Sequence, residues 1–257
     1  MTRLLSLSTF VIALVSADAR GQRLADRVGS ARDGIVSFSF AARDGVCGDG
    51  DQFMKIGGSS FGAWSGTRSA PCVFGPVQVS LTLHDGDVER IQTRVGPPRA
   101  RGEMDLGAVP AAEAASYLMR VAARGRGTAS TKAILPAVLA DSATVWPALL
   151  AIARDTATRP RSTRQEAAFW LSRFAGGAVL GHRNDPMAET ETEPGDTDDL
   201  KSHAVFVLSQ LPRGEGVPSL LDVARTNRDP HVRSQALFWL GQSGDPRALA
   251  LFELLLQ

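Results

Sequence analysis

Apolar and polar residues alternate between about residues 30 and 98. Residues 36–40 and 77–84 show the pattern most clearly, with valine, leucine or phenylalanine at alternate positions. A period of two is typical of strands that bury one face. The pattern therefore predicts a small antiparallel β domain, followed by a polar linker that runs to about residue 107.

A hairpin is predicted at Asp85-Gly86, where the second alternating run meets a third. A two-residue turn there would pair Leu83 with Val88 and would turn Ile91 away from the apolar face. A three-residue loop that begins one residue earlier instead pairs Val79 with Ile91. Because this loop keeps the apolar residues on one face, the sequence favours it.

From about residue 111 the apolar positions recur every three to four residues, which is typical of amphipathic helices. Proline, glycine and aspartate separate short helical segments. These segments cover residues 111–124, 130–141, 144–155, 163–175, 199–211, 217–226, 230–242 and 246–256. The chain is thus predicted to be α+β by domains, with a β domain over residues 20–107 and a helical domain over residues 108–257.

The helical part contains an internal repeat. Three ten-residue segments that begin at Arg164, Lys201 and Arg233 align without a gap, with a basic residue, alanine, phenylalanine and leucine in the same columns. The last two copies are 32 residues apart and the first two are 37 apart, because an acidic loop at residues 184–198 is inserted between them. Such self-similarity is typical of helical repeat architectures.

The stretch from Asp229-Pro230 through Gly244-Asp245 resembles the short HEAT-like repeats also found in phycobilisome lyases. The resemblance covers about residues 144–257. It implies an α-solenoid of stacked antiparallel helix pairs, in which an aspartate and an arginine of each repeat tie neighbours together. Asp229 and Arg233 match that pair.

Helix physics supports the same architecture. Asp229 can cap a helix whose first turn contains a proline. Val232, Ala236, Trp239 and Leu240 share one face, which is predicted to be core. Since one helix pair cannot bury such a face alone, pairs must stack.

Phe169, Phe206 and Phe238 occupy a single column of the repeat. At about 100° per residue this column lies opposite the core face. The three rings either pack between repeats or form an exposed apolar stripe that binds a partner. We expect a mixed case, with Phe206 mostly buried and Phe238, nearer the end of the solenoid, more exposed.

The first 19 residues are typical of a secretory signal peptide. Arg3 is followed by the apolar run of residues 4–16 and by Ala17-Asp18-Ala19, which suits signal peptidase. Export to the periplasm or the exterior is therefore predicted. The only two cysteines, Cys47 and Cys72, then form a disulfide bond that staples a glycine-rich loop.

The charge balance, 28 basic against 27 acidic residues, argues against a nucleic-acid partner. No second apolar run is long enough to span a membrane. The scattered histidines suggest no metal site. No cofactor is expected, and attachment of a phycobilin is disfavoured because the helical part lacks cysteine.

Two motifs suggest chemistry only weakly. Residues 58–62 match the nucleophile elbow of hydrolases, but the residues after them are typical of a loop rather than of the required helix. Residues 189–199 hold six carboxylates without the spacing of a calcium-binding EF-hand, and a solvated loop is favoured.

The sequence thus favours a non-catalytic, exported protein or peptide binder with a scaffolding role. One alternative is a hydrolase-like envelope enzyme. Another is a structural envelope protein that self-associates, because the helix at residues 248–256 has no following partner helix and could leave an apolar edge for a homodimer.

Overall fold

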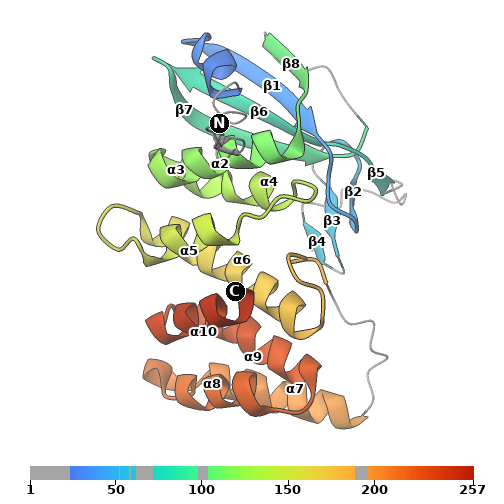
Figure 1. Cartoon of the computed structure of the whole chain (residues 1–257), viewed down its shortest axis with the longest axis vertical. Coiled ribbons are helices and arrows are strands. Elements are labelled where there is room, and N and C mark those ends of the chain that lie inside the picture. Colours follow the sequence, from blue (N-terminus) through green and yellow to red (C-terminus); the bar gives the residue numbers. More distant parts are fainter. Residues whose placement is uncertain (1–23, 52, 58, 62–71, 98–103, 189–195) are drawn as a thin grey trace, which may run out of the picture.

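The computed structural model describes residues 24–51, 53–57, 59–61, 72–97, 104–188 and 196–257. A β-sheet lies at one end of the molecule, and layers of helices are stacked beneath it (Figure 1). The strands are β1 (Gly34–Phe40), β2 (Val46–Gly48), β3 (Met54–Ile56), β4 (Ser59–Phe61), β5 (Val73–Phe74), β6 (Val77–His84), β7 (Asp87–Val95) and β8 (Met104–Ala108). The helices are α2 (Ala111–Arg124), α3 (Gly127–Lys132), α4 (Ile134–Val138), α5 (Trp146–Arg154), α6 (Arg161–Val179), α7 (Asp196–Ser209), α8 (Val217–Thr226), α9 (Pro230–Ser243) and α10 (Pro246–Leu256), with a 3-10 turn, η1 (Pro212–Gly214), before α8.

The larger sheet has the strand order β7-β6-β1-β8. Strands β1 and β6 are antiparallel, and their alternating apolar residues are buried as the sequence pattern predicts. Strand β8 pairs in parallel with β1 at the edge of the sheet. Residues 104–107, which the sequence pattern assigns to the linker, therefore belong to the sheet.

The β6–β7 hairpin corrects the predicted register. Its turn is the two-residue Asp85-Gly86, with φ of 50° and 82°, and Leu83 pairs with Val88. The preference for a three-residue loop is wrong. A bulge directly after Val88 then shifts the register, so that Leu81 pairs with Ile91. Ile91 is consequently buried on the same face of the sheet as Leu81. One extra residue in a strand moves each later side chain to the opposite face of the sheet.

A smaller sheet with the order β4-β3-β2-β5 occupies much of the stretch that the sequence suggests is a loop. The predicted disulfide bond between Cys47 and Cys72 is confirmed, with a Cα–Cα distance of 5.2 Å. It lies beside the pairing of β2 with β5, where Cys47 is opposite Phe74. The bond therefore joins β2 to the residue directly before β5, which are the first and last strands of the smaller sheet in chain order.

Removing this disulfide bond is expected to lower the free energy of unfolding by about 3 kcal/mol, because the unfolded chain regains the freedom of a loop closed over a separation of 25 residues. Urea denaturation of the oxidised protein and of the double variant Cys47→Ala/Cys72→Ala measures the effect. A reductant should weaken the unmodified protein and leave the variant unchanged. Equal stability of the two oxidised proteins would contradict the prediction.

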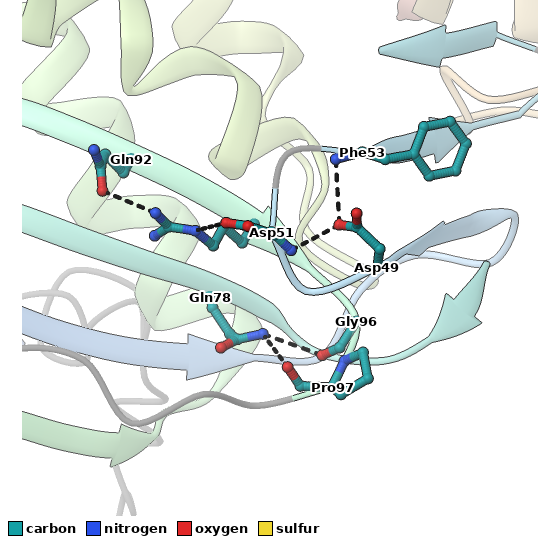
Figure 2. A network of polar contacts seen from close by, with 8 residues as sticks. Asp49, Asp51, Phe53, Gln78, Gln92, Gly96 and Pro97 are labelled. Carbon is teal, nitrogen blue, oxygen red and sulfur yellow. Dashed lines mark hydrogen bonds and ion pairs between the residues drawn. The ribbon is translucent and has the colours of Figure 1, made fainter. Parts of the chain in front are cut away.

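Polar contacts fasten the smaller sheet to the end of the β6–β7 hairpin (Figure 2). The Oδ1 atom of Asp49 accepts the backbone N–H groups of Asp51 and Phe53 at 2.7 and 3.2 Å, which fixes the loop after β2. The Asp51 carboxylate lies 3.5 Å from Nε of Arg94 on β7. A Cβ atom on Gly48 would lie 2.3 Å from the carbonyl oxygen of residue 95, so glycine is needed where the chains cross.

The sheet and the first helices share a hydrophobic core across the predicted domain boundary. Helices α2 and α3 lie against the larger sheet, and α4 packs on α2 (Figure 1). Phe38 of β1 meets Tyr117 of α2 edge to face, with the ring centroids 6.3 Å apart. The buried apolar residues of both halves form one continuous cluster.

The remaining helices pack in pairs, but their order in space differs from their order in the chain. The pair α9/α10 lies between α5/α6 and α7/α8 (Figure 1). Helix α6 packs against α9 rather than beside α7. The chain therefore reaches the far end of the stack at α7 and α8 and then returns toward α6.

Helix α10 consequently lies in the middle of the stack. It packs against α5, α6 and α9, and Nη2 of Arg154 on α5 is 2.6 Å from Oε2 of Glu253 on α10. The apolar edge expected at the last helix is therefore partly covered, by a helix that precedes it by almost 100 residues in the chain. The end of the stack is formed by α7 and α8.

Candidate binding surface on the helical stack

Helices α6, α9 and α7 lie next to one another in the stack (Figure 1), and ring contacts connect the repeated phenylalanines that they carry. The ring centroids of Phe169 and Phe238 are 6.1 Å apart. Trp239 continues the line, with its ring 5.1 Å from Phe238 and 5.3 Å from Phe206. We call Phe169, Phe238, Trp239 and Phe206 the aromatic ridge.

The exposure of the aromatic ridge increases toward the end of the stack. Phe169, Phe238 and Trp239 are half-buried, whereas Phe206 is 40% exposed. The expectation of a buried Phe206 and a more exposed Phe238 is therefore wrong. The cause is the stacking order, which places α9 in the middle and α7 at the end.

Two further residues at the ridge are not indicated by the phenylalanine column. The helical pattern places Trp239 in the core with Val232 and Leu240, but its ring lies in the ridge. His203, one turn before Phe206, lies 6.2 Å from that ring. A signal for Trp239 exists in the repeat, since the column after the phenylalanines holds Trp170 and Trp239 in two of its copies.

A cavity of about 220 Å³ adjoins the exposed end of the ridge. Trp239 and Leu211 line it, together with residues of α7 and α8. Leu211 and Val207 are exposed by 40% and 46%, respectively. The end of the ridge is thus an apolar surface with a hollow beside it, a shape suited to an apolar side chain of a partner.

Asp229 and Arg233 join α9 to α7 and α6, respectively. Asp229 accepts the N–H of His231 at 2.9 Å, which caps α9, and its Oδ2 lies 3.3 Å from Nζ of Lys201 on α7. Nη2 of Arg233 donates to the carbonyl oxygen of Val179 at the end of α6, at 3.4 Å. Partial burial raises the pKa of Asp229, but hydrogen bonds from the amide of His231 and the ammonium of Lys201 lower it. The pKa of Asp229 therefore lies below its ordinary value.

Only part of the two motifs that weakly suggest chemistry lies within the described residues, and residues 58 and 62 of the first motif do not. Ser60 lies within strand β4, opposite Lys55 of β3, and not at a turn between a strand and a helix. Side chains of residues 189–200 lie outside what the structure describes, and with them most of the acidic loop. Within the part that is described, no three His, Cys, Asp or Glu side chains are arranged to hold a metal ion.

Residues 232–257 match the family model of the PBS lyase HEAT-like repeat. The match covers most of α9 and all of α10, and it confirms the resemblance for the C-terminal part of the chain. Comparison with curated proteins and with solved structures gave no match. No helix in the described ranges has the length and apolar content needed to cross a membrane.

Proposed function

We propose that this protein is an exported, non-catalytic scaffold whose helical stack, a HEAT-like α-solenoid, binds a segment of another protein. The aromatic ridge is the binding surface. The observation that carries the proposal is the apolar end of the ridge, where Phe206, Val207 and Leu211 are each at least 40% exposed beside a cavity. Contiguous apolar surface of this kind marks interaction sites on soluble proteins.

The form of the ridge supports a macromolecular ligand. Aromatic side chains dominate binding energy in protein interfaces because each covers a large area with few rotatable bonds. The ridge extends over three helices, which suits an extended segment or a helix better than a small molecule. HEAT-like repeats build extended binding surfaces of this type.

The location in the cell envelope rests on two features. The disulfide bond between Cys47 and Cys72 is stable in oxidising compartments and rare in the cytosol. The secretory signal expected over residues 1–19 would bring the chain there, although it lies outside the described residues.

Phe206→Ala is expected to weaken capture of the partner from an envelope fraction by about tenfold or more, while it costs less than about 1 kcal/mol of stability, as surface changes do. Phe74→Ala is the matched control, because Phe74 is 73% exposed on β5 and outside the ridge. Quantitative mass spectrometry of captured proteins and urea denaturation supply the two measurements.

Two results would contradict the proposed role of the ridge in binding. If Phe206→Ala costs about 3–5 kcal/mol, as buried phenylalanines do, and the folded fraction captures the partner normally, the ridge has only a packing role. Equal capture by the Phe206→Ala and Phe74→Ala variants would likewise contradict the proposal.

A further inference from the structure

A second cavity, of about 260 Å³, lies where the pair α5/α6 meets α9/α10. Its polar wall includes Arg161, Arg164 and Gln165 in the first turns of α6, with Ser243 and Asp245 opposite in the chain's last two helices and their connection. Its apolar floor includes Leu240 of α9 and Leu249 and Phe252 of α10. The cavity therefore combines cationic and apolar surface in a small volume.

The two arginines have no acidic partner within the described chain. Nε of Arg164 is buried and has no hydrogen-bond acceptor, and no ion pair engages Arg161 or Arg164. A buried donor without a partner is unfavourable, because it has given up water without replacing it. An anion that enters the cavity would balance the positive charge of the two arginines that line it.

The one acidic residue that the structure places on the lining of this cavity already has a basic partner. Asp245, which lines the cavity, binds Arg247 through contacts of 2.8 and 3.0 Å. The hydrogen bond from Arg247 holds the pKa of Asp245 below its ordinary value, so this carboxylate stays charged and balanced by its own arginine. The cavity's uncompensated charge is thus the positive charge of the arginines.

We propose that this cavity binds the C-terminal residue of a polypeptide, with its carboxylate at Arg161 and Arg164 and its apolar side chain on the floor. The planar guanidinium matches a carboxylate through two parallel hydrogen bonds. The volume lies just below the range of common small-molecule sites, which suits one terminal residue.

The position of the cavity favours a polypeptide over a free carboxylic acid. Gln165 on its wall and Phe169 of the aromatic ridge are one helical turn apart on α6. On α9, Gly241 of the cavity and Phe238 of the ridge are likewise about one helical turn apart. A chain seated on the ridge therefore runs past the cavity. The inference deepens the proposed function and rests on it, since it names the end of the partner.

Isothermal titration of the full chain with acetyl-Gly-Gly-Ala-Leu tests the site, with the peptide as free acid and as C-terminal amide. The acid should bind, and the amide should bind about tenfold or more weakly, as loss of a charge-assisted hydrogen bond implies. Arg164→Gln should reduce binding of the acid to the level of the amide. Arg225→Gln, at an exposed arginine of α8 outside the cavity, should leave it unchanged.

Arg161→Gln keeps the test decisive if Arg164→Gln impairs folding, because Arg161 is exposed. Three results would each overturn the proposal. The peptide acid does not bind, or it binds no more tightly than the amide, or both Arg161→Gln and Arg164→Gln bind the acid normally. Octanoate is the second probe, and binding as tight as that of the peptide acid would assign the site to free carboxylic acids instead.

Failure of the cavity and failure of the ridge are distinguishable. If only the cavity proposal is wrong, Phe206→Ala still weakens capture of the partner while acid and amide bind alike. If only the ridge proposal is wrong, the acid is still preferred over the amide, but Phe206→Ala captures as much partner as the unmodified protein.

Discussion

Replacing Arg43 with alanine is expected to lower the free energy of unfolding by about 3–5 kcal/mol, since the change removes a charged group from a partly buried network and leaves its acceptors unpaired. Nε of Arg43 donates to the carbonyl oxygen of Val138 in α4 at 2.7 Å, and Nη1 donates to that of Asn184 at 2.8 Å. Nη2 donates to the carbonyl oxygen of Ala143. The guanidinium also lies 5.7 Å from the ring centroid of Phe174 in α6.

The effect is large because one side chain from the β half holds several segments of the helical half. Arg43 follows β1, and the adjoining Ala42 forms a bridge with Ala140. Burial lowers the pKa of Arg43, while Asp185 and Asp141 oppose the shift. The guanidinium nevertheless stays charged at neutral pH, since an arginine does not lose its proton in proteins. Each of its hydrogen bonds is therefore of the stronger, charge-assisted type.

Urea denaturation of Arg43→Ala, Arg43→Lys and Arg225→Ala measures this contribution. Lysine should recover only part of the loss, because an ammonium cannot reproduce the planar arrangement of the guanidinium donors. Arg225→Ala, at an exposed site on α8, should stay within about 0.5 kcal/mol. A loss below about 1 kcal/mol for Arg43→Ala would show that the two halves are held together without this residue.

Local features of the fold were predictable from the sequence because they depend on neighbouring residues. Period-two alternation located β1 and β6, and proline with helical periodicity located the starts of α8 and α9 at Val217 and Pro230. The disulfide followed from there being only two cysteines. The shared phenylalanine column also identified three of the four residues of the aromatic ridge.

The order of the stack was not predictable in this way. Helices α6, α7 and α9 carry the same residue types in the same columns, so the pattern does not distinguish which two of them are neighbours. The column after the repeated leucine holds Ser172, Ser209 and Gly241, which permits close approach in any order. The exposure of the ridge depends on that order. Arg43 belongs to no repeat, and nothing in the local sequence indicates its distant acceptors.

Gly241→Leu is expected to cost more than about 3 kcal/mol and to abolish both capture of the partner and binding of the peptide acid. A Cβ atom on Gly241 would lie 2.5 Å from both Cβ and Oγ of Ser172 and 3.1 Å from the carbonyl oxygen of Ala168 on α6. Because even one added carbon does not fit, a leucine must push α9 away from α6. This separation would break the contact between Phe169 and Phe238 and would distort the cavity at the same junction.

Thermal and urea denaturation, titration with the peptide acid and capture from the envelope fraction measure the three effects on one variant. Arg225→Leu is the control, since Arg225 is exposed on α8 outside both cavities and the same substitution there should change stability by about 0.5 kcal/mol or less. The double variant Gly241→Ala/Ser172→Gly should be more stable than Gly241→Ala alone, because removing the Ser172 side chain makes room for the added methyl group. If Gly241→Leu is as stable and binds as well as Arg225→Leu, then α6 and α9 are not in close contact. The proposals for the ridge and for the cavity, which both depend on that contact, would then both be wrong.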